Sequence, residues 1–369
     1  MKMCQDEIYA WLALSMIPGI GNRVFKNLLE VFGQPVEVFE AEFAELLKVE
    51  GVGSQVARRI VNREFISDPQ VELKRVEICS ARILTYDDMA YPNLLKNIPQ
   101  APMLLYIKGK DIPIIQEFIA IVGSRNPTHY GVRAAENIAM GLAKRGVGVV
   151  SGLATGIDSA AHRGCLMGKG FTIAVLGTGI DVIYPAPNKG LSDQVMAQGA
   201  LVSEFPTGTP PEPKNFPIRN RIISGLAKGV VVVEATMRSG SLITASLALE
   251  QGREVFAVPG SIDSFKSTGT HFLIKQGAKL VENAEDILEE FGVPGLPVQD
   301  REASTGTSEA IVHMDESERK IYELIGNYPM HVDQIVRLGN MDAGEVLSIL
   351  MQMELKGIVK QLPGKMFVR

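Results

Sequence analysis

The sequence contains few of the residues that build disulfide frameworks or metal centres. Its 369 residues include three cysteines, Cys4, Cys79 and Cys165, which lie far apart and form no CxxC pair. No pair of histidines lies near them at metal-ligand spacing. This pattern is typical of a reducing, cytoplasmic setting. We therefore expect no metal site and no other cofactor.

Long apolar runs and a strong net charge are also absent. No stretch approaches the roughly 20 apolar residues of a membrane-spanning helix, and the first residues lack the apolar region of a secretion signal. We therefore expect a cytoplasmic protein without a membrane span. The formal net charge of −5 argues against a polybasic coat for nucleic acid. A local basic groove remains compatible with that charge.

The chain is long enough for two or three domains, and 46% of its residues are apolar, as in ordinary globular proteins. We interpret residues 1–75 as a helical domain and residues 76–292 as a sheet domain. Residues 293–310 are rich in Pro, Gly, Ser and Thr, which predicts a linker. Residues 311–369 form a small C-terminal domain with its own apolar helices.

Short apolar runs in the central domain alternate with helical patterns, which predicts βαβ units and a parallel sheet. The runs are 118–122, 147–150, 172–176, 201–202, 230–233 and 255–258. Ligands of such sheets bind beyond the carboxyl ends of the strands. Polar turns follow there: Gly123-Ser124-Arg125, residues 151–156, Gly177-Thr178-Gly179 and Ser239-Gly240-Ser241. Backbone amides at helix N-termini bind phosphate, so we predict an anion site at this edge.

A proline-rich loop precedes the helical pattern at 218–226 and carries cations around one aromatic ring. Lys214, Arg219 and Arg221 offer positive charge, and Phe216 offers a flat face. Cations beside a stacking ring are how proteins hold single-stranded nucleic acid without sequence preference. The alternative is that Phe216 packs beneath the loop. Likewise, Arg125 could be an ordinary surface arginine paired with an acid.

Two local features of these helices can also be predicted. Pro217 suits the first position of the helix that contains residues 218–226, because proline has no N–H to leave unpaired. The hydroxyl of Ser239 suits the cap of the helix at 242–250.

Candidates for catalysis are weaker. Asp158 and His162 lie four residues apart at a helix start and could imitate an acid–base pair, but no nucleophile lies at a defined spacing from them. We favour a structural capping role for this pair. Glu204 and Glu234 end strands near the same edge, where isolated carboxylates are poor indicators of catalysis. We therefore expect a protein that is not an enzyme.

The flanking segments carry patterns found in DNA-binding domains. Residues 19–21 and 51–53 are Gly-hydrophobic-Gly turns before helical patterns, which resemble the helix-hairpin-helix motif. These turns could expose amides to a DNA phosphate. The alternative is that they only close a compact helical bundle or contact another protein. Residues 311–369 predict three helices and two strands about Pro363-Gly364, an arrangement that resembles a winged helix. Duplex binding through the basic wing at 360–369 and protein docking both remain open.

Several long motifs of the central domain resemble the DprA/Smf family, the DNA-processing proteins of bacterial transformation. The resemblance covers about residues 119–281 and departs slightly at His271, where the family pattern has Asn. The motifs, in family order, are GSRNPTHYG at 123–131, SGLATGIDSAAHRG at 151–164, IAVLGTGIDVIYPAPN at 173–188, EFPTG at 204–208, FPIRNRIISGLAKGVVVVEATMRSGSLITA at 216–245 and GREVFAVPG at 252–260.

The resemblance implies an α/β fold: an extended Rossmann-like parallel sheet flanked by an N-terminal helical SAM-like (double helix-hairpin-helix) domain and a C-terminal winged helix. It also implies a homodimer that binds and protects incoming single-stranded DNA, displaces single-strand-binding protein and loads RecA. Phe216 would stack a base, Asn220 and Arg221 would support the pocket, and Lys214 would match the family's basic residue before the FPxRN motif. The implied phosphate contacts are Gly123, Ser124, Arg125, Ser239, Gly240 and Ser241.

The alternative is a nucleotide-processing enzyme on the same fold, such as a phosphoribohydrolase of the lysine-decarboxylase-like group. That group carries the signature PGGxGTxxE after a late strand. Here the late strands are followed by EATMRSGS at 234–241 and VPGSID at 258–263, and neither matches. Fold alone does not decide function, but the missing signature favours the DNA-binding mediator.

Overall fold

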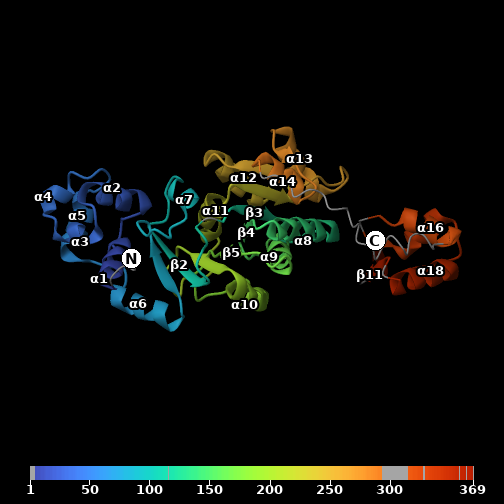
Figure 1. The fold of residues 1–369 in the computed structure, drawn as a ribbon, viewed down its shortest axis with the longest axis horizontal. Coiled ribbons are helices and arrows are strands. Elements are labelled where there is room, and N and C mark those ends of the chain that lie inside the picture. Colours follow the sequence, from blue (N-terminus) through green and yellow to red (C-terminus); the bar gives the residue numbers. More distant parts are fainter. Residues whose placement is uncertain are drawn as a thin grey trace. The chain divides into compact units, whose positions relative to one another are not determined.

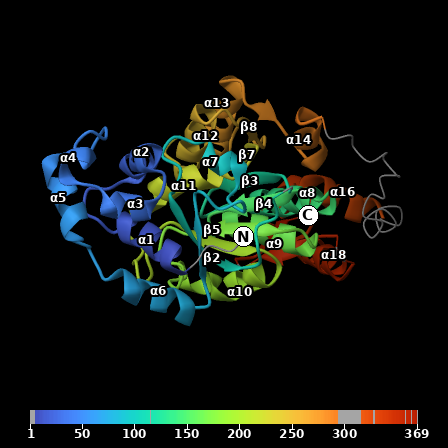
Figure 2. The same cartoon turned by 60° about the vertical axis from the view of Figure 1, so that its left-hand side comes forward.

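The computed structural model describes residues 5–114, 116–292, 315–326, 329–356, 358–362 and 364–368. The chain forms two compact units, one of residues 1–126 with 134–287 and one of residues 127–133 with 288–369. Figures 1 and 2 show the elements from two directions. The predicted linker at 293–310 lies outside the described residues.

The first unit is built on a nine-stranded sheet in the order β1-β2-β6-β5-β4-β3-β7-β8-β9. Strands β3 to β9 pair in parallel, while β2 pairs antiparallel with both β1 and β6. All six predicted apolar runs overlap strands, because strands covered on both faces need apolar side chains on both sides. The strands are β1 (Arg82–Thr85), β2 (Leu104–Gly109), β3 (Phe118–Gly123), β4 (Gly148–Ser151), β5 (Thr172–Val175), β6 (Ala200–Ser203), β7 (Gly229–Val233), β8 (Glu254–Ala257) and β9 (Lys279–Leu280).

Helices cover the sheet on both faces, which confirms the predicted Rossmann-like architecture. In both views the strands lie between α9 and α10 on one side and α12 and α13 on the other (Figures 1 and 2). The helices of this region are α7 (Asn93–Lys96), α8 (His129–Lys144), α9 (Ile157–Met167), α10 (Lys189–Gln198), α11 (Asn215–Gly225), α12 (Gly240–Glu250), α13 (Thr268–Lys275) and α14 (Ala284–Glu290).

The chain reverses its direction of travel across the sheet between β3 and β7. Strands β3 to β6 follow one another outward in one direction, whereas β7, β8 and β9 continue from the other side of β3. Such a switch point opens a crevice at the carboxyl ends of the strands. Gly123 ends β3 there, and a Cβ on it would lie 1.8 Å from the carbonyl oxygen of Val233. The absence of a side chain therefore lets β3 and β7 meet at the floor of the crevice.

The N-terminal helices form two hairpins that pack against each other. Val24, from the first hairpin, lies against Gly51 in the second turn, and Val56 lies against Gly19 in the first turn. Their apolar core includes Trp11, which stacks on Phe25 with ring centres 5.3 Å apart, and is continuous with the core of the sheet. The helices are α1 (Gln5–Ser15), α2 (Asn22–Phe32), α3 (Pro35–Glu40), α4 (Phe43–Leu46), α5 (Ser54–Asn62) and α6 (Pro69–Ile78).

The C-terminal part folds as the predicted winged helix around its own apolar core. Helices α16 (Glu316–Leu324), α17 (Val332–Gly339) and α18 (Ala343–Leu355) pack on a small sheet ordered β10-β12-β11. That sheet contains β11 (Lys360–Leu362), β12 (Met366–Val368) and the short β10 (Met330–His331), which sequence patterns did not predict. Pro363 and Arg369 of the predicted wing lie outside the described residues. Among the residues described in either unit, no helix combines the length and apolar character needed to cross a membrane.

Candidate functional site

A pocket of about 640 Å³ lies at the switch point, beyond the ends of β3 and β7. Its walls come from the turn after β3, from α11 with the loop before it, and from the start of α12. The fold therefore brings together segments that are far apart in the sequence. Among the predicted site residues, those that line the pocket are Gly123, Ser124, Arg125, Phe216, Arg219, Asn220, Ser239, Gly240 and Ser241.

The turn after β3 is fixed through its backbone and leaves one cation exposed. The carbonyl of Ser124 accepts from the amide of Ile157 at 3.1 Å, and the carbonyl of Arg125 accepts from the hydroxyl of Thr155 at 3.2 Å. The side chain of Arg125 is exposed, and its guanidinium carbon lies 5.6 Å from the centre of the Phe216 ring. The turn thus holds a cation over an aromatic face.

Phe216 is half-buried and forms part of the pocket wall. It packs so closely on Gly177 that a Cβ there would lie 2.8 Å from the ring. The ring of Tyr184, 44% exposed, lies 5.7 Å away between centres and also lines the pocket. Both interpretations of Phe216 therefore have a structural basis, since one part of the ring packs and another part faces the pocket.

Tyr184 did not emerge as a site residue from the sequence. The available signal was its position on the loop that follows the Gly177-Thr178-Gly179 turn, at the edge where ligands of parallel sheets bind. The hydroxyl of Thr178 donates to the carbonyl of Val182 at 2.6 Å, which ties this loop to the end of β5.

Arg219 lies in the pocket wall but directs its guanidinium mainly into the protein. Its side chain donates to the carbonyl of Gly152 at 2.8 Å and also to the carbonyl of Val175. The residue is 3% exposed, and burial lowers its pKa to about 10, an effect that nearby Asp158 opposes. Arg219 therefore ties α11 to the ends of β4 and β5, rather than offering the open cationic contact that the loop pattern suggests.

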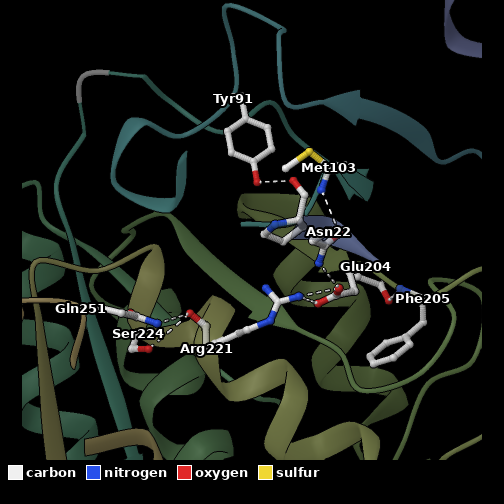
Figure 3. Close-up of polar contacts among 10 residues, drawn as sticks. Asn22, Tyr91, Met103, Glu204, Phe205, Arg221, Ser224 and Gln251 are labelled. Carbon is white, nitrogen blue, oxygen red and sulfur yellow. Dashed lines mark hydrogen bonds and ion pairs between the residues drawn. The ribbon is translucent and has the colours of Figure 1, made fainter. Parts of the chain in front are cut away.

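Arg221 lies outside the pocket lining. Figure 3 shows its guanidinium against the carboxylate of Glu204, which also accepts from the side-chain amide of Asn22. The two charged side chains are 11% and 15% exposed. The prediction of a direct cationic contact from Arg221 is corrected accordingly, because its charge is already neutralised inside the protein. Its place on α11 still allows it to support the pocket from behind.

Lys214 also lies outside the pocket lining. Its side chain is 75% exposed, and its ammonium lies 2.7 Å from the carboxylate of Glu212. An exposed pair of this kind contributes little stability, so the lysine can change partners at small cost.

The structure corrects two helix starts. Helix α11 begins at Asn215, which places Pro217 inside the first turn rather than at its first position. Proline is tolerated there because first-turn amides have no acceptor within the helix. Ser239 precedes α12, but its hydroxyl meets the hydroxyl of Ser241 at 2.8 Å and does not cap the helix.

Asp158 and His162 have separate partners and do not form an acid–base pair. The Asp158 carboxylate accepts from the amides of Gly152 at 3.1 Å and Ala154 at 3.3 Å. His162 contacts the hydroxyl of Thr172 at 2.8 Å, and burial, aided by nearby arginines, lowers its pKa to about 3. Both side chains hold internal structure. Within the described residues, no group of three or more His, Cys, Asp or Glu side chains could hold a metal ion.

Comparison with known protein families places all three parts of the chain. Residues 82–292 match DNA recombination-mediator protein A, residues 305–365 the DprA winged helix domain, and residues 12–63 a SAM-like helix-hairpin-helix tandem.

Individual relatives support the same placement. Protein Smf of Synechocystis is 36% identical over 401 aligned positions, covering 100% of both chains. The crystal structure of DprA from Streptococcus pneumoniae has a TM-score of 0.68 at 38% identity, covering 79% of this chain and 99% of that one. A structure of DNA processing protein A from Helicobacter pylori, reported for its single-stranded DNA binding mode, has a TM-score of 0.51 at 28% identity and covers 57% of this chain and 95% of that one. The chain is therefore a member of the DprA/Smf family of DNA recombination-mediator proteins.

Proposed function

We propose that the protein binds single-stranded DNA in the pocket at the switch point and acts there as a recombination mediator. The observation that carries this proposal is the meeting of Arg125, the N-terminus of α12 and Phe216 in one pocket. The Helicobacter pylori relative, whose structure concerns single-stranded DNA binding, supports the choice of ligand.

The pocket offers separate groups for the two parts of a nucleotide. The amides of Gly240 and Ser241 open α12, have no acceptor within the helix and lie at the positive end of its dipole, so they suit a phosphate. Arg125 adds a guanidinium that can bind a phosphate with two parallel hydrogen bonds. The open part of Phe216 and the neighbouring Tyr184 offer flat apolar surface to a base. A single strand, whose bases are unpaired, presents both parts at once, whereas a duplex hides its bases.

Membership of the family supports the proposed biological role. We propose that the protein protects incoming DNA during natural transformation, displaces single-strand-binding protein and loads RecA, and that it works as a cytoplasmic homodimer. We further propose that it does not hydrolyse nucleotides. The buried contacts of Asp158 and His162 support this view, because both side chains already serve internal structure.

Binding across a salt series tests the proposal. Fluorescence anisotropy with a labelled oligo-dT strand and with a duplex of the same length should show tighter binding of the single strand. The logarithm of its affinity should fall linearly with the logarithm of salt concentration. Equal affinity for the duplex would contradict the proposal. So would turnover of a nucleoside monophosphate that disappears in Glu204→Gln or Glu234→Gln.

RecA loading has its own test. RecA filament formation on a strand coated with single-strand-binding protein should be faster when the protein is present. If filament formation is not faster, the proposed mediator role fails, but the proposed binding of single-stranded DNA is unaffected.

A further inference from the structure

The first N-terminal hairpin contacts the sheet through a partly buried polar network that ends at α11. The side chain of Asn22, the first residue of α2, donates to Glu204 at 3.3 Å and accepts from the amide of Met103 at 3.4 Å. Glu204 in turn pairs with Arg221 on α11, with one nitrogen–oxygen distance of 2.5 Å (Figure 3). One chain of contacts thus joins the hairpin, the end of β6 and α11.

Arg221 is well placed to set the position of the pocket wall. It follows Asn220 directly and lies on the same helix as Phe216, and both of these residues line the pocket. From the other side, Gln251 at the end of α12 donates to the carbonyl of Arg221 at 3.1 Å. An ion pair as buried as Arg221–Glu204 leaves a costly unpaired charge when one partner is removed. The helix therefore cannot move away from Glu204 without penalty.

The contact around Asn22 combines polar groups with apolar side chains of the continuous core. A cavity of about 290 Å³ lies beside it, lined by Gly21, Asn22, Glu204 and other residues of both segments. A second polar contact joins the N-terminal helices to the sheet domain. Glu72 on α6 accepts from the amide and the hydroxyl of Thr207, each at 2.7 Å. Disruption of the Asn22 hydrogen bonds therefore leaves the N-terminal helices attached.

The second hairpin is the near-duplicate of the first but has a different environment. Helix α5 begins at Ser54 after Gly53, just as α2 begins at Asn22 after Gly21. Ser54 is exposed, whereas Asn22 is half-buried against the sheet. The two positions thus form an internal matched pair: the same local structure, with and without the link to Glu204.

We infer that the first hairpin is a brace for the strand-binding site, and that Asn22 is a positioning residue which holds α11 in place through Glu204 and Arg221. The inference rests on the proposed binding of single strands. It gives the N-terminal domain a role in shaping the site that does not depend on touching DNA.

Asn22→Asp tests the brace with Ser54→Asp as its control. Each variant adds one carboxylate at the first residue of a helix, where the dipole favours it. In Asn22→Asp the new carboxylate keeps an acceptor for the amide of Met103 but faces Glu204 with a second negative charge. We expect Asn22→Asp to weaken oligo-dT binding by roughly tenfold, or about 1.4 kcal/mol, and Ser54→Asp to bind as the wild type does.

The double variant Asn22→Asp/Glu204→Gln exchanges the amide and the carboxylate and restores the charge of the network. We expect it to regain part of the affinity that Asn22→Asp forfeits, a non-additivity that only coupled residues show. Wild-type affinity in Asn22→Asp would overturn the brace. Equal reductions in Asn22→Asp and Ser54→Asp would also overturn it, because both hairpins would then contact DNA directly.

Hydrogen exchange without DNA separates the brace from the proposed function. Asn22→Asp should speed amide exchange along α11, and Ser54→Asp should not. If Asn22→Asp speeds exchange along α11 but the wild type does not bind single-stranded DNA, the brace is upheld and the proposed function is contradicted. Unchanged exchange in Asn22→Asp would remove the brace even if the wild type binds single strands.

Discussion

Arg125 is the exposed arginine in the pocket lining, so its removal should affect DNA binding through charge. We expect Arg125→Ala to lower single-strand affinity and to flatten the salt dependence. Removing one phosphate contact from a single strand reduces the slope of log affinity against log salt by about 0.7. The measurement is the slope from anisotropy titrations at several salt concentrations.

Arg163→Ala provides a charge-matched control for Arg125→Ala. Arg163 pairs with Glu136 at 3.1 Å, is about half exposed, and does not line this pocket. Removal of this positive charge should therefore leave the slope nearly unchanged. An unaltered slope in Arg125→Ala, or an equal change in both variants, would remove Arg125 from the site.

Phe216 can be tested by separating its volume from its flat face. Phe216→Leu retains most of the apolar bulk that rests on Gly177, but it offers no ring to a base. If a base stacks on Phe216, the substitution should weaken single-strand binding by about 1–3 kcal/mol with little change in melting temperature. A lower melting temperature with unchanged affinity would instead show that Phe216 only packs. Tyr184→Leu, measured alongside, shows whether the second ring contributes.

Residue type and motif could predict most of the residues that meet at the pocket, but they missed Tyr184 and did not give the direction of each charge. Arg219 and Arg221 lie two positions apart in a loop-and-helix segment rich in cations, yet both direct their charge inward. Their partners are the carbonyls of Gly152 and Val175 for one and Glu204 for the other. These contacts depend on the order of β4, β5 and β6 in the sheet, which no local pattern encodes.

At the scale of elements, burial explains what could be read from the sequence. Strand β7 is buried at every position, and such strands appear as continuous apolar runs. Strands β1 and β2 lie at one edge and pair antiparallel, outside the βαβ alternation that revealed the others. Strand β9 has two residues, one half-buried and one exposed, and so leaves no apolar run. The central sheet was thus predictable and its borders were not.

Helix α9 carries a pH-sensitive contact with the sheet at His162. Its pKa is about 3 in the folded protein and 6.5 ordinarily, because burial and two nearby arginines disfavour the charged ring. Below pH 6.5 the unfolded chain binds a proton that the folded chain does not. Stability from this group is therefore fully present above pH 6.5 and is lost as the pH falls toward 3, by about 1.4 kcal/mol per pH unit.

His162→Gln should remove this dependence, because glutamine can still contact the hydroxyl of Thr172 but does not titrate. Urea unfolding at pH 7, 6 and 5 gives the free energy of unfolding of both proteins. The free energy of unfolding of the wild type, relative to that of His162→Gln, should decrease as the pH falls. Other titrating groups affect both proteins alike and cancel in this difference. Parallel curves for the two proteins would show that His162 is not buried in its neutral form.

At the scale of the whole molecule, the two compact units differ in the cationic groups that they offer to DNA. The first unit contains the complete pocket, including Arg125, Phe216 and the start of α12. In the second unit, α18 takes the place of the DNA-reading helix of a winged helix, but it contains no lysine or arginine. Duplex recognition relies on cations that contact phosphates and base edges. The helix is therefore poorly suited to DNA, and the wing with Lys360 and Lys365 is the alternative surface for a duplex.

Deletion of residues 300–369 should leave most of the single-strand affinity intact. The winged helix has its own apolar core, so its removal should not unfold the sheet unit, and the groups proposed to contact the strand all lie upstream. Anisotropy with oligo-dT measures the affinity, and circular dichroism checks the fold of the truncated protein.

The isolated segment 311–369 is the complementary control and should bind single strands far more weakly than the truncated protein. Weaker duplex binding or loss of a protein partner after the deletion would assign that contact to the winged helix. A truncated protein that is folded yet cannot bind single strands would place the principal site in the C-terminal domain, because the pocket at the switch point would then be insufficient by itself.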